Sequence, residues 1–150
     1  MKFVATEDIA QPIEAVWARV SDLEAFEDRI ARSHPGIRRS PPGPAGEGTA
    51  WTGEAEILGK RRVVTVTAAT LRAPDHLAVD AGTDGMAVTL LVELQALGPR
   101  LTRMVVTTEA AARSLPARLM LHSAKLARAS LAARYKARVA EFATRVETTA

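Results

Sequence analysis

Residues 9–26 read IAQPIEAVWARVSDLEAF, and they mark a change from strand to helix near the start of the chain. Residues 2–10 alternate in polarity, which predicts a β-strand with Glu7 on the same face as Phe3, Ala5 and Ile9. Pro12 suits the first turn of a helix, because the N–H group that proline lacks would have no partner there. Ser21, followed three residues later by Glu24, forms a capping box that predicts a second short helix. One strand and two short helices therefore open the chain.

The middle of the chain follows a period of two, which is typical of antiparallel strands. Residues 34–48 first form a loop rich in proline and glycine, around a short segment at residues 37–40. From residue 49 onward, short alternating runs are separated by turn sequences. The runs lie at residues 51–57, 64–68, 77–81, 86–94 and 104–108. This pattern predicts a meander of five strands joined by hairpins.

The last third of the chain has helical spacing. Residues 115–146 contain no glycine, and Pro116 would lie in the first turn, so we predict one long helix. At about 100° per residue, one apolar stripe runs along the whole helix and a second occupies only its first half. The first stripe contains Met120, Ala124, Ala127, Leu131, Tyr135, Val139, Phe142 and Val146, and the second contains Leu115, Leu119, His122 and Leu126. We expect the first stripe to cover a sheet and the second to face a loop, a second subunit or the mouth of a cavity.

Length and composition set the class of protein. The chain has 150 residues, of which 47% are hydrophobic and 25% charged, as expected for a single soluble domain spanning residues 1–150. The absence of cysteine excludes disulfides, Cys-ligated metal sites and thiol catalysis. Glu7 and Asp8 lie where a signal peptide would need an apolar stretch. The longest apolar run, residues 86–97, is too short to span a bilayer. We therefore expect no transmembrane segment and a cytoplasmic location.

The net charge of +3 raises the question of nucleic-acid binding. Most of the excess lies in the C-terminal stretch, at Arg113, Arg118, Lys125, Arg128, Arg134, Lys136, Arg138 and Arg145. No aromatic residues interleave with these charges to form a stacking platform, so we predict no nucleic-acid partner. We interpret the stretch as a solvated helix face, with weak affinity for an anionic membrane surface or an acidic partner as the alternative.

The order of the predicted elements has a structural consequence. A curved antiparallel sheet of six or seven strands cannot bury its concave face against itself, but a long amphipathic helix laid across that face can cover it. This α+β arrangement is a helix-grip fold. The sequence resembles the START-like superfamily, also called the SRPBCC or Bet v 1-like group, including its polyketide cyclase/dehydrase and lipid-transport branch. The resemblance rests on residues 9–17, on Val20-Ser21-Asp22 and on Phe26.

The resemblance implies a hydrophobic cavity between the sheet and the long helix, which would hold a lipid, a polyketide or a similar small molecule. Alternation along the strands and the first helix stripe select the residues that would face it. They are Trp51, Ala55, Ile57, Val64, Val66, Leu77, Val79, Val88, Leu90, Met104 and Val106 on the sheet, with Met120, Ala124 and Ala127 opposite. The alternative is that these side chains simply fill the core.

Few residues in the sequence are candidates for catalysis. No Gly-x-Ser-x-Gly elbow is present, and His34 and His76 lie beside prolines in turns. Glu7 on an apolar strand face and His122 on the second helix stripe are the catalytic candidates. No spacing of histidines and acids indicates a metal site, and no glycine loop indicates a phosphate-binding cofactor, so we expect neither.

The sequence therefore favours a domain that binds a small hydrophobic ligand and has no catalytic role. One alternative is an enzyme of the cyclase or dehydratase kind, in which Glu7 or His122 moves a proton on a polyketide-like substrate. That alternative predicts that both side chains project into the cavity. Another is a protein-interaction module, or a homo-oligomer, that docks through Leu115, Leu119 and Leu126.

Overall fold

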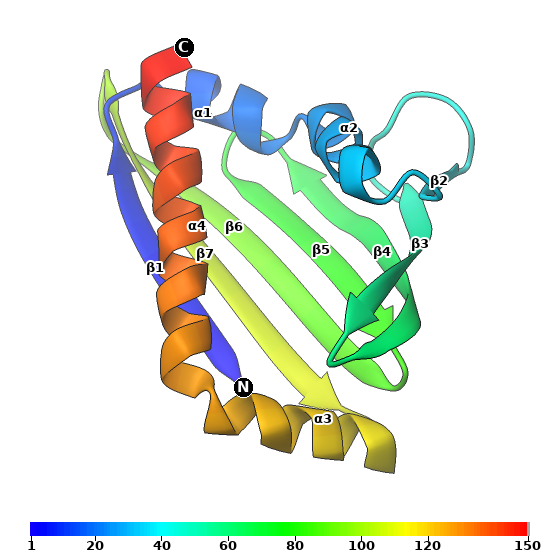
Figure 1. Ribbon diagram of the computed structural model, residues 1–150. Helices are drawn as coiled ribbons and strands as arrows, with labels where there is room; N and C mark the ends of the chain where they lie inside the picture. Colours follow the sequence, from blue (N-terminus) through cyan, green and yellow to red (C-terminus); the bar gives the residue numbers. More distant parts are fainter. Residues whose placement is uncertain (150) are drawn as a thin grey trace.

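The computed structural model describes residues 1–149 and has seven strands and four helices (Figure 1). The elements are β1 (Lys2–Ile9), α1 (Ile13–Val20), α2 (Leu23–Ser33), β2 (Arg38–Ser40), β3 (Ala50–Ile57), β4 (Lys60–Arg72), β5 (His76–Thr83), β6 (Met86–Gly98), β7 (Leu101–Ala112), α3 (Leu115–Leu126) and α4 (Arg128–Thr149). None of the described helices combines the length and the apolar composition needed to cross a bilayer.

The strands form one antiparallel sheet in the order β1-β7-β6-β5-β4-β3-β2. Hairpins connect each consecutive pair of strands from β3 through β7. Two of their turns place consecutive residues at positive φ, Leu58-Gly59 and Asp84-Gly85. This conformation matches the right-handed twist of the flanking strands, and it is easiest for glycine. β1 pairs with β7, so the first and last strands of the chain lie side by side. The predicted helix-grip sheet is confirmed, with seven strands.

The two short helices lie where the opening sequence predicts them, but the cap of the second one differs. Asp22, not Ser21, accepts a hydrogen bond from the N–H of Ala25, at 3.1 Å. Ser21 donates to the Trp17 carbonyl oxygen at 2.7 Å and so closes α1. The capping-box pattern places the N-cap of α2 at Ser21. Because Ser21 still ends α1, the N-cap of α2 lies one residue later, at Asp22.

The predicted single helix over residues 115–146 is wrong, because the chain turns at Ala127 and forms two helices (Figure 1). A straight helix of that length would measure about 48 Å, whereas the eight residues of β1, along which α4 lies, span about 27 Å. Arg128 fixes the start of α4 at the beginning of β1, since its guanidinium lies 5.8 Å from the Phe3 ring centroid and donates to the Lys2 carbonyl oxygen at 3.4 Å. The residues before Arg128 extend beyond the beginning of β1, so this strand does not lie beneath them. They form α3, which crosses the end of β7.

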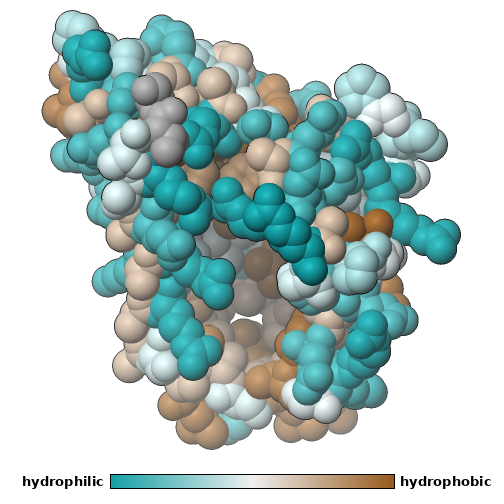
Figure 2. Space-filling view, turned by 45° about the horizontal axis from the view of Figure 1, so that its top comes forward, coloured by the Kyte–Doolittle hydropathy of each residue, from teal (hydrophilic) through white to brown (hydrophobic). Residues whose placement is uncertain are grey.

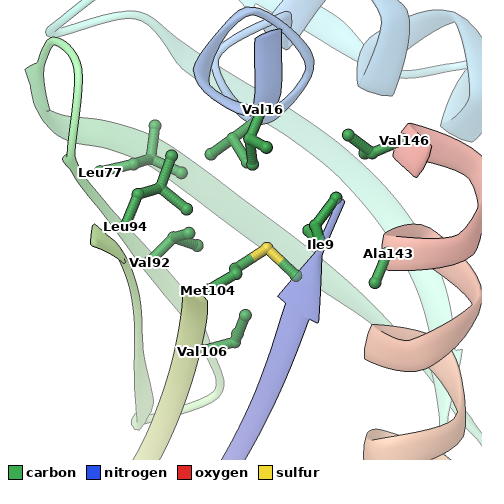
Figure 3. Packing of buried hydrophobic residues seen from close by; sticks show 10 residues of the cluster. Ile9, Val16, Leu77, Val92, Leu94, Met104, Val106, Ala143 and Val146 are labelled. Atoms are coloured by element: carbon green, nitrogen blue, oxygen red, sulfur yellow. The ribbon is translucent and has the colours of Figure 1, made fainter. Parts of the chain in front are cut away.

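The core lies where α1, the C-terminal end of α4 and the strands β1, β7, β6 and β5 meet (Figure 3). Ile9, Val16 and Val146 are fully buried there and come from β1, α1 and α4. Met104 and Leu94 fill the space beneath them on β7 and β6. The strand-to-helix stretch around Ile9 and Val16 thus forms the closed end of the fold.

Candidate functional site

A pocket of about 560 Å³ lies on the concave face of the sheet, beside this core. Figure 2 shows the molecule hollowed here, with hydrophobic residues inside and hydrophilic residues around the rim. The sheet supplies its floor through Trp51, Val66, Ala68, Leu77, Val79, Leu90, Val92, Met104 and Val106. The helices supply its walls through Val20, Leu23, Phe26, Ile30, Val139 and Phe142. A volume of this size is typical of small-molecule sites.

The structure places only part of the sequence-predicted cavity set in this pocket. The predicted residues that line it are Trp51, Val66, Leu77, Val79, Leu90, Met104 and Val106. The predicted residues that lie outside its lining are Ala55, Ile57, Val64, Val88, Met120, Ala124 and Ala127.

The division follows from how far the helices reach along the strands. Val64 pairs with Gly53, two residues closer to the β3–β4 turn than the pair of Val66 and Trp51. The strand period assigns Val64 and Val66 to the same face, but the pocket lining, which includes residues of α2 and α4, reaches Val66 and not Val64. Because of the turn at Ala127, Met120 and Ala124 are carried away from the pocket on α3.

One acid–base cluster holds α2 over the pocket. Glu27 of α2 accepts hydrogen bonds from Arg39 Nε at 2.9 Å and from Trp51 Nε1 at 2.8 Å, and Arg39 Nη2 bonds its second oxygen. The Arg39 guanidinium, and less strongly the Trp51 N–H, hold the pKa of Glu27 below its ordinary value, against the opposing effect of burial. Glu27 therefore remains a carboxylate, which joins α2 to β2 and β3.

Tyr135 joins the opposite wall to the floor. Its hydroxyl donates to the Val106 carbonyl oxygen at 2.9 Å, and Thr108 Oγ1 lies 3.1 Å away. Burial raises the pKa of Tyr135, with a smaller opposing effect from the Thr108 hydrogen bond. The ring lies 5.6 Å from the Phe3 ring, centroid to centroid. Tyr135 is thus a structural link between α4 and β7 that also lines the pocket.

Aromatic rings and arginines lie together where α2 and α4 approach each other. The Phe26 and Phe142 rings lie 5.8 Å apart, and the guanidinium groups of Arg29 and Arg145 lie over them at 5.7 and 5.9 Å. Arg138 also lines the pocket, is exposed, and makes no hydrogen bond or ion pair with the described residues. The rim therefore carries positive charge over an apolar interior, which favours an anionic group at the opening.

The two predicted catalytic candidates lie elsewhere. Glu7 is half-buried on β1 and lines a separate, smaller hollow beside Lys136 and Ala140. His122 is exposed on α3. Neither is among the residues that line the large pocket, so the structure does not bring them together around one ligand. Among residues 1–149, no three acids or histidines gather in a way that would hold a metal ion.

The sequence interpretation missed several lining residues, among them Ala68 and Val92 on the sheet and the walls from α2 and α4, and Glu27 is the charged one that holds α2 in place. It lies among Leu23, Phe26 and Ile30, on the apolar stripe of a short helix, where a solvated acid is out of place. Arg39, twelve residues later, was its available partner. The sequence signal for this contact was therefore an acid on the apolar stripe of a short helix, followed later in the chain by two consecutive arginines.

Comparisons with known proteins identify the family. The family model described as "Polyketide cyclase / dehydrase and lipid transport" matches residues 1–147. The chain belongs to this family. No curated protein matches the sequence.

Solved structures of this family's fold resemble the chain over nearly its whole length. TTHA0849 from Thermus thermophilus has a TM-score of 0.64 at 16% identity, covering 97% of each chain. The ZhuI aromatase/cyclase from Streptomyces sp. R1128 has a TM-score of 0.63 at 17% identity, covering 99% of this chain and 97% of that one. Ara h 8.0201 has a TM-score of 0.60 at 12% identity, covering 98% and 95%. The chain therefore has the helix-grip fold of the Bet v 1-like group.

Proposed function

We propose that this family member binds a small, elongated hydrophobic molecule in the pocket between the sheet and the helices α2 and α4. The observation that carries the proposal is the lining itself: most residues of the floor and walls are aliphatic or aromatic, and these side chains offer a ligand apolar contact. The family description and the fold support the same class of function.

The polar groups of the lining suggest the form of the ligand. Glu27 and Tyr135 already have internal hydrogen-bond partners, so a ligand would gain little by bonding to them. Arg138 at the rim has no such partner among the described residues, and its charge would favour a carboxylate or another anion at the end of the ligand. We therefore expect an apolar body in the pocket and an anionic end at the rim.

A cyclase or dehydratase role is the second candidate, and it is favoured by the description of the family and by the aromatase/cyclase fold. Such chemistry needs a group that can accept or give a proton beside the ligand. Glu27 and Tyr135 are lining residues of that kind, but the Glu27 carboxylate is bonded to Arg39 and Trp51, and the Tyr135 proton is held by the Val106 carbonyl oxygen. Binding needs no such group, and we propose it first.

Fluorescence of Trp51 tests the binding proposal. In a Trp17→Phe background, Trp51 is the only tryptophan and lies in the pocket lining. Titration with dodecanoate should change its emission and saturate. Val66→Phe places a larger ring in the pocket and should weaken binding at least tenfold, whereas Val64→Phe, on the same strand and face, is the matched control and should not. If dodecanoate, dodecanol and a naphthalene probe all fail to give a saturable change, the proposal is wrong.

A further inference from the structure

The helix α3 exposes a line of leucines to solvent. Leu115, Leu119 and Leu126 are 70%, 63% and 83% exposed. At about 100° per residue these positions fall within about 40° of one another on the helix surface. The buried Ala117 and the half-buried Ala124 lie on the opposite side, toward β7. The three leucines therefore point away from the protein, and they do not contribute to its core.

Basic residues flank this line, and acids are missing from it. Arg118, Lys125 and His122 follow the leucines along one side of the same helix. The sequence contains no aspartate or glutamate from residue 110 to residue 140. The lysines and arginines in this segment are Arg113, Arg118, Lys125, Arg128, Arg134, Lys136 and Arg138. The leucines thus lie in a region of positive charge that no nearby acid in the sequence neutralises.

We propose that α3 docks this protein on an anionic membrane surface, with Leu115, Leu119 and Leu126 inserted at the boundary between headgroups and acyl chains. A helix that lies in this boundary needs apolar side chains on one line and basic side chains beside it, whose long stems reach back to the phosphates. Figure 1 shows α3 lying across one end of the molecule. Leu115, Leu119 and Leu126 are exposed along one line of this helix, so one flat surface reaches all three. The proposal stands without regard to what the pocket holds.

Charge distinguishes this occupant from a second copy of the chain. A twofold pair of α3 helices would bring Arg118 and Lys125 of one copy toward the same residues of the other, and like charges across an interface are unfavourable. An anionic lipid surface neutralises them instead. A neutral membrane would not neutralise these basic side chains, so we expect an anionic surface to be preferred.

Flotation with lipid vesicles tests the proposal, with phosphatidylcholine vesicles and vesicles that also contain phosphatidylglycerol as the two probes. The full chain should float with the anionic vesicles and not with the neutral ones, and high salt should release it. The double variant Leu119→Ser/Leu126→Ser should lose at least tenfold in binding. Arg118→Gln/Lys125→Gln should lose about 30-fold, from about fivefold for each charge.

The β6–β7 turn provides the matched control, because it also exposes a leucine and carries an arginine but lies at the other end of β7. Leu97→Ser and Arg100→Gln should leave flotation unchanged, and all variants should keep the wild-type circular dichroism. The proposal is overturned if the chain ignores anionic vesicles, if it binds neutral ones equally, or if the control changes match those on α3. It is also overturned if sedimentation shows a dimer that Leu119→Ser dissociates, because the leucines would then be occupied by a second copy.

Discussion

The concave face of the sheet has two halves that differ in how they are covered. Around Ile9, α1 packs on β6 and β7 and α4 packs on β1, and Ile9, Val16 and Val146 are fully buried. Over β3, β4 and β5 the side chains of α2 and α4 border a hollow instead, and Val66, Ala68 and Val79 form part of its floor. The same alternating pattern therefore produces core in one half and a pocket in the other. The covering helices, and not the strands, make the difference.

Truncation of one large apolar side chain in each half should show this difference most strongly. Ile9→Ala removes a fully buried side chain and should cost about 3 to 4 kcal/mol of unfolding free energy. Leu90→Ala removes a half-buried side chain that already borders empty space, and should cost about 1 to 2 kcal/mol. Urea denaturation of both variants measures the gap, and equal costs would show that the pocket is as well filled as the core.

The cluster that holds α2 in place should give a loss of stability that depends on pH. Glu27→Gln should cost about 1 to 2 kcal/mol at neutral pH, because Arg39 loses its anionic partner. The folded-state pKa of Glu27 lies below its ordinary value of 4.5, so its contribution is complete above that value and disappears as the pH falls through the lower one. Thermal unfolding of wild type and variant should therefore converge in acid. A gap that does not shrink as the pH falls below 4.5 would contradict this role of the charge.

Tyr135 should contribute less. Tyr135→Phe keeps the ring beside Phe3 but removes the hydrogen bond to the Val106 carbonyl oxygen, and should cost about 1 kcal/mol. Because burial raises the pKa of Tyr135, wild type should lose stability above about pH 10 and the variant should lose less. Thermal unfolding at neutral and alkaline pH checks both effects, and parallel curves across that range would contradict the second.

The smallest effect should be the one on the form of the ligand. Arg138→Gln should weaken the binding of dodecanoate about twofold to fourfold and leave dodecanol binding unchanged, since only the carboxylate interacts with the guanidinium. Arg134→Gln, one helical turn earlier on the same helix and outside the pocket lining, is the matched control. An equal change for both probes would remove the anionic end from the proposal while leaving pocket binding intact.

Periodicity predicted the fold because each element has a clear local pattern. Alternating polarity predicted the strands, Pro12 predicted the start of α1, and the turn sequences predicted the hairpins. The turn at Ala127 carries no glycine or proline, and it arises from the limited length of β1 beneath α4, which local sequence does not encode.

The candidate site was predictable only as a face of the sheet. The strand period separates inward from outward residues, and it places Val64 and Val66 together. It cannot say how far along the strands α2 and α4 extend, and this determines which of the two lines the pocket. Glu27 was missed because its partner Arg39 reaches it only after the Pro/Gly-rich segment folds back over α2.

Methyl NMR of a valine- and leucine-labelled sample tests the central claim most directly. On addition of dodecanoate, the methyl signals of Val66, Val79 and Leu90 should shift in a saturable manner, while those of Val64 and Val88 on the same face should stay in place. Shifts confined to Val64 and Val88, or no saturable shift at all, would contradict the assignment of the hollow half of the sheet as the ligand-binding site.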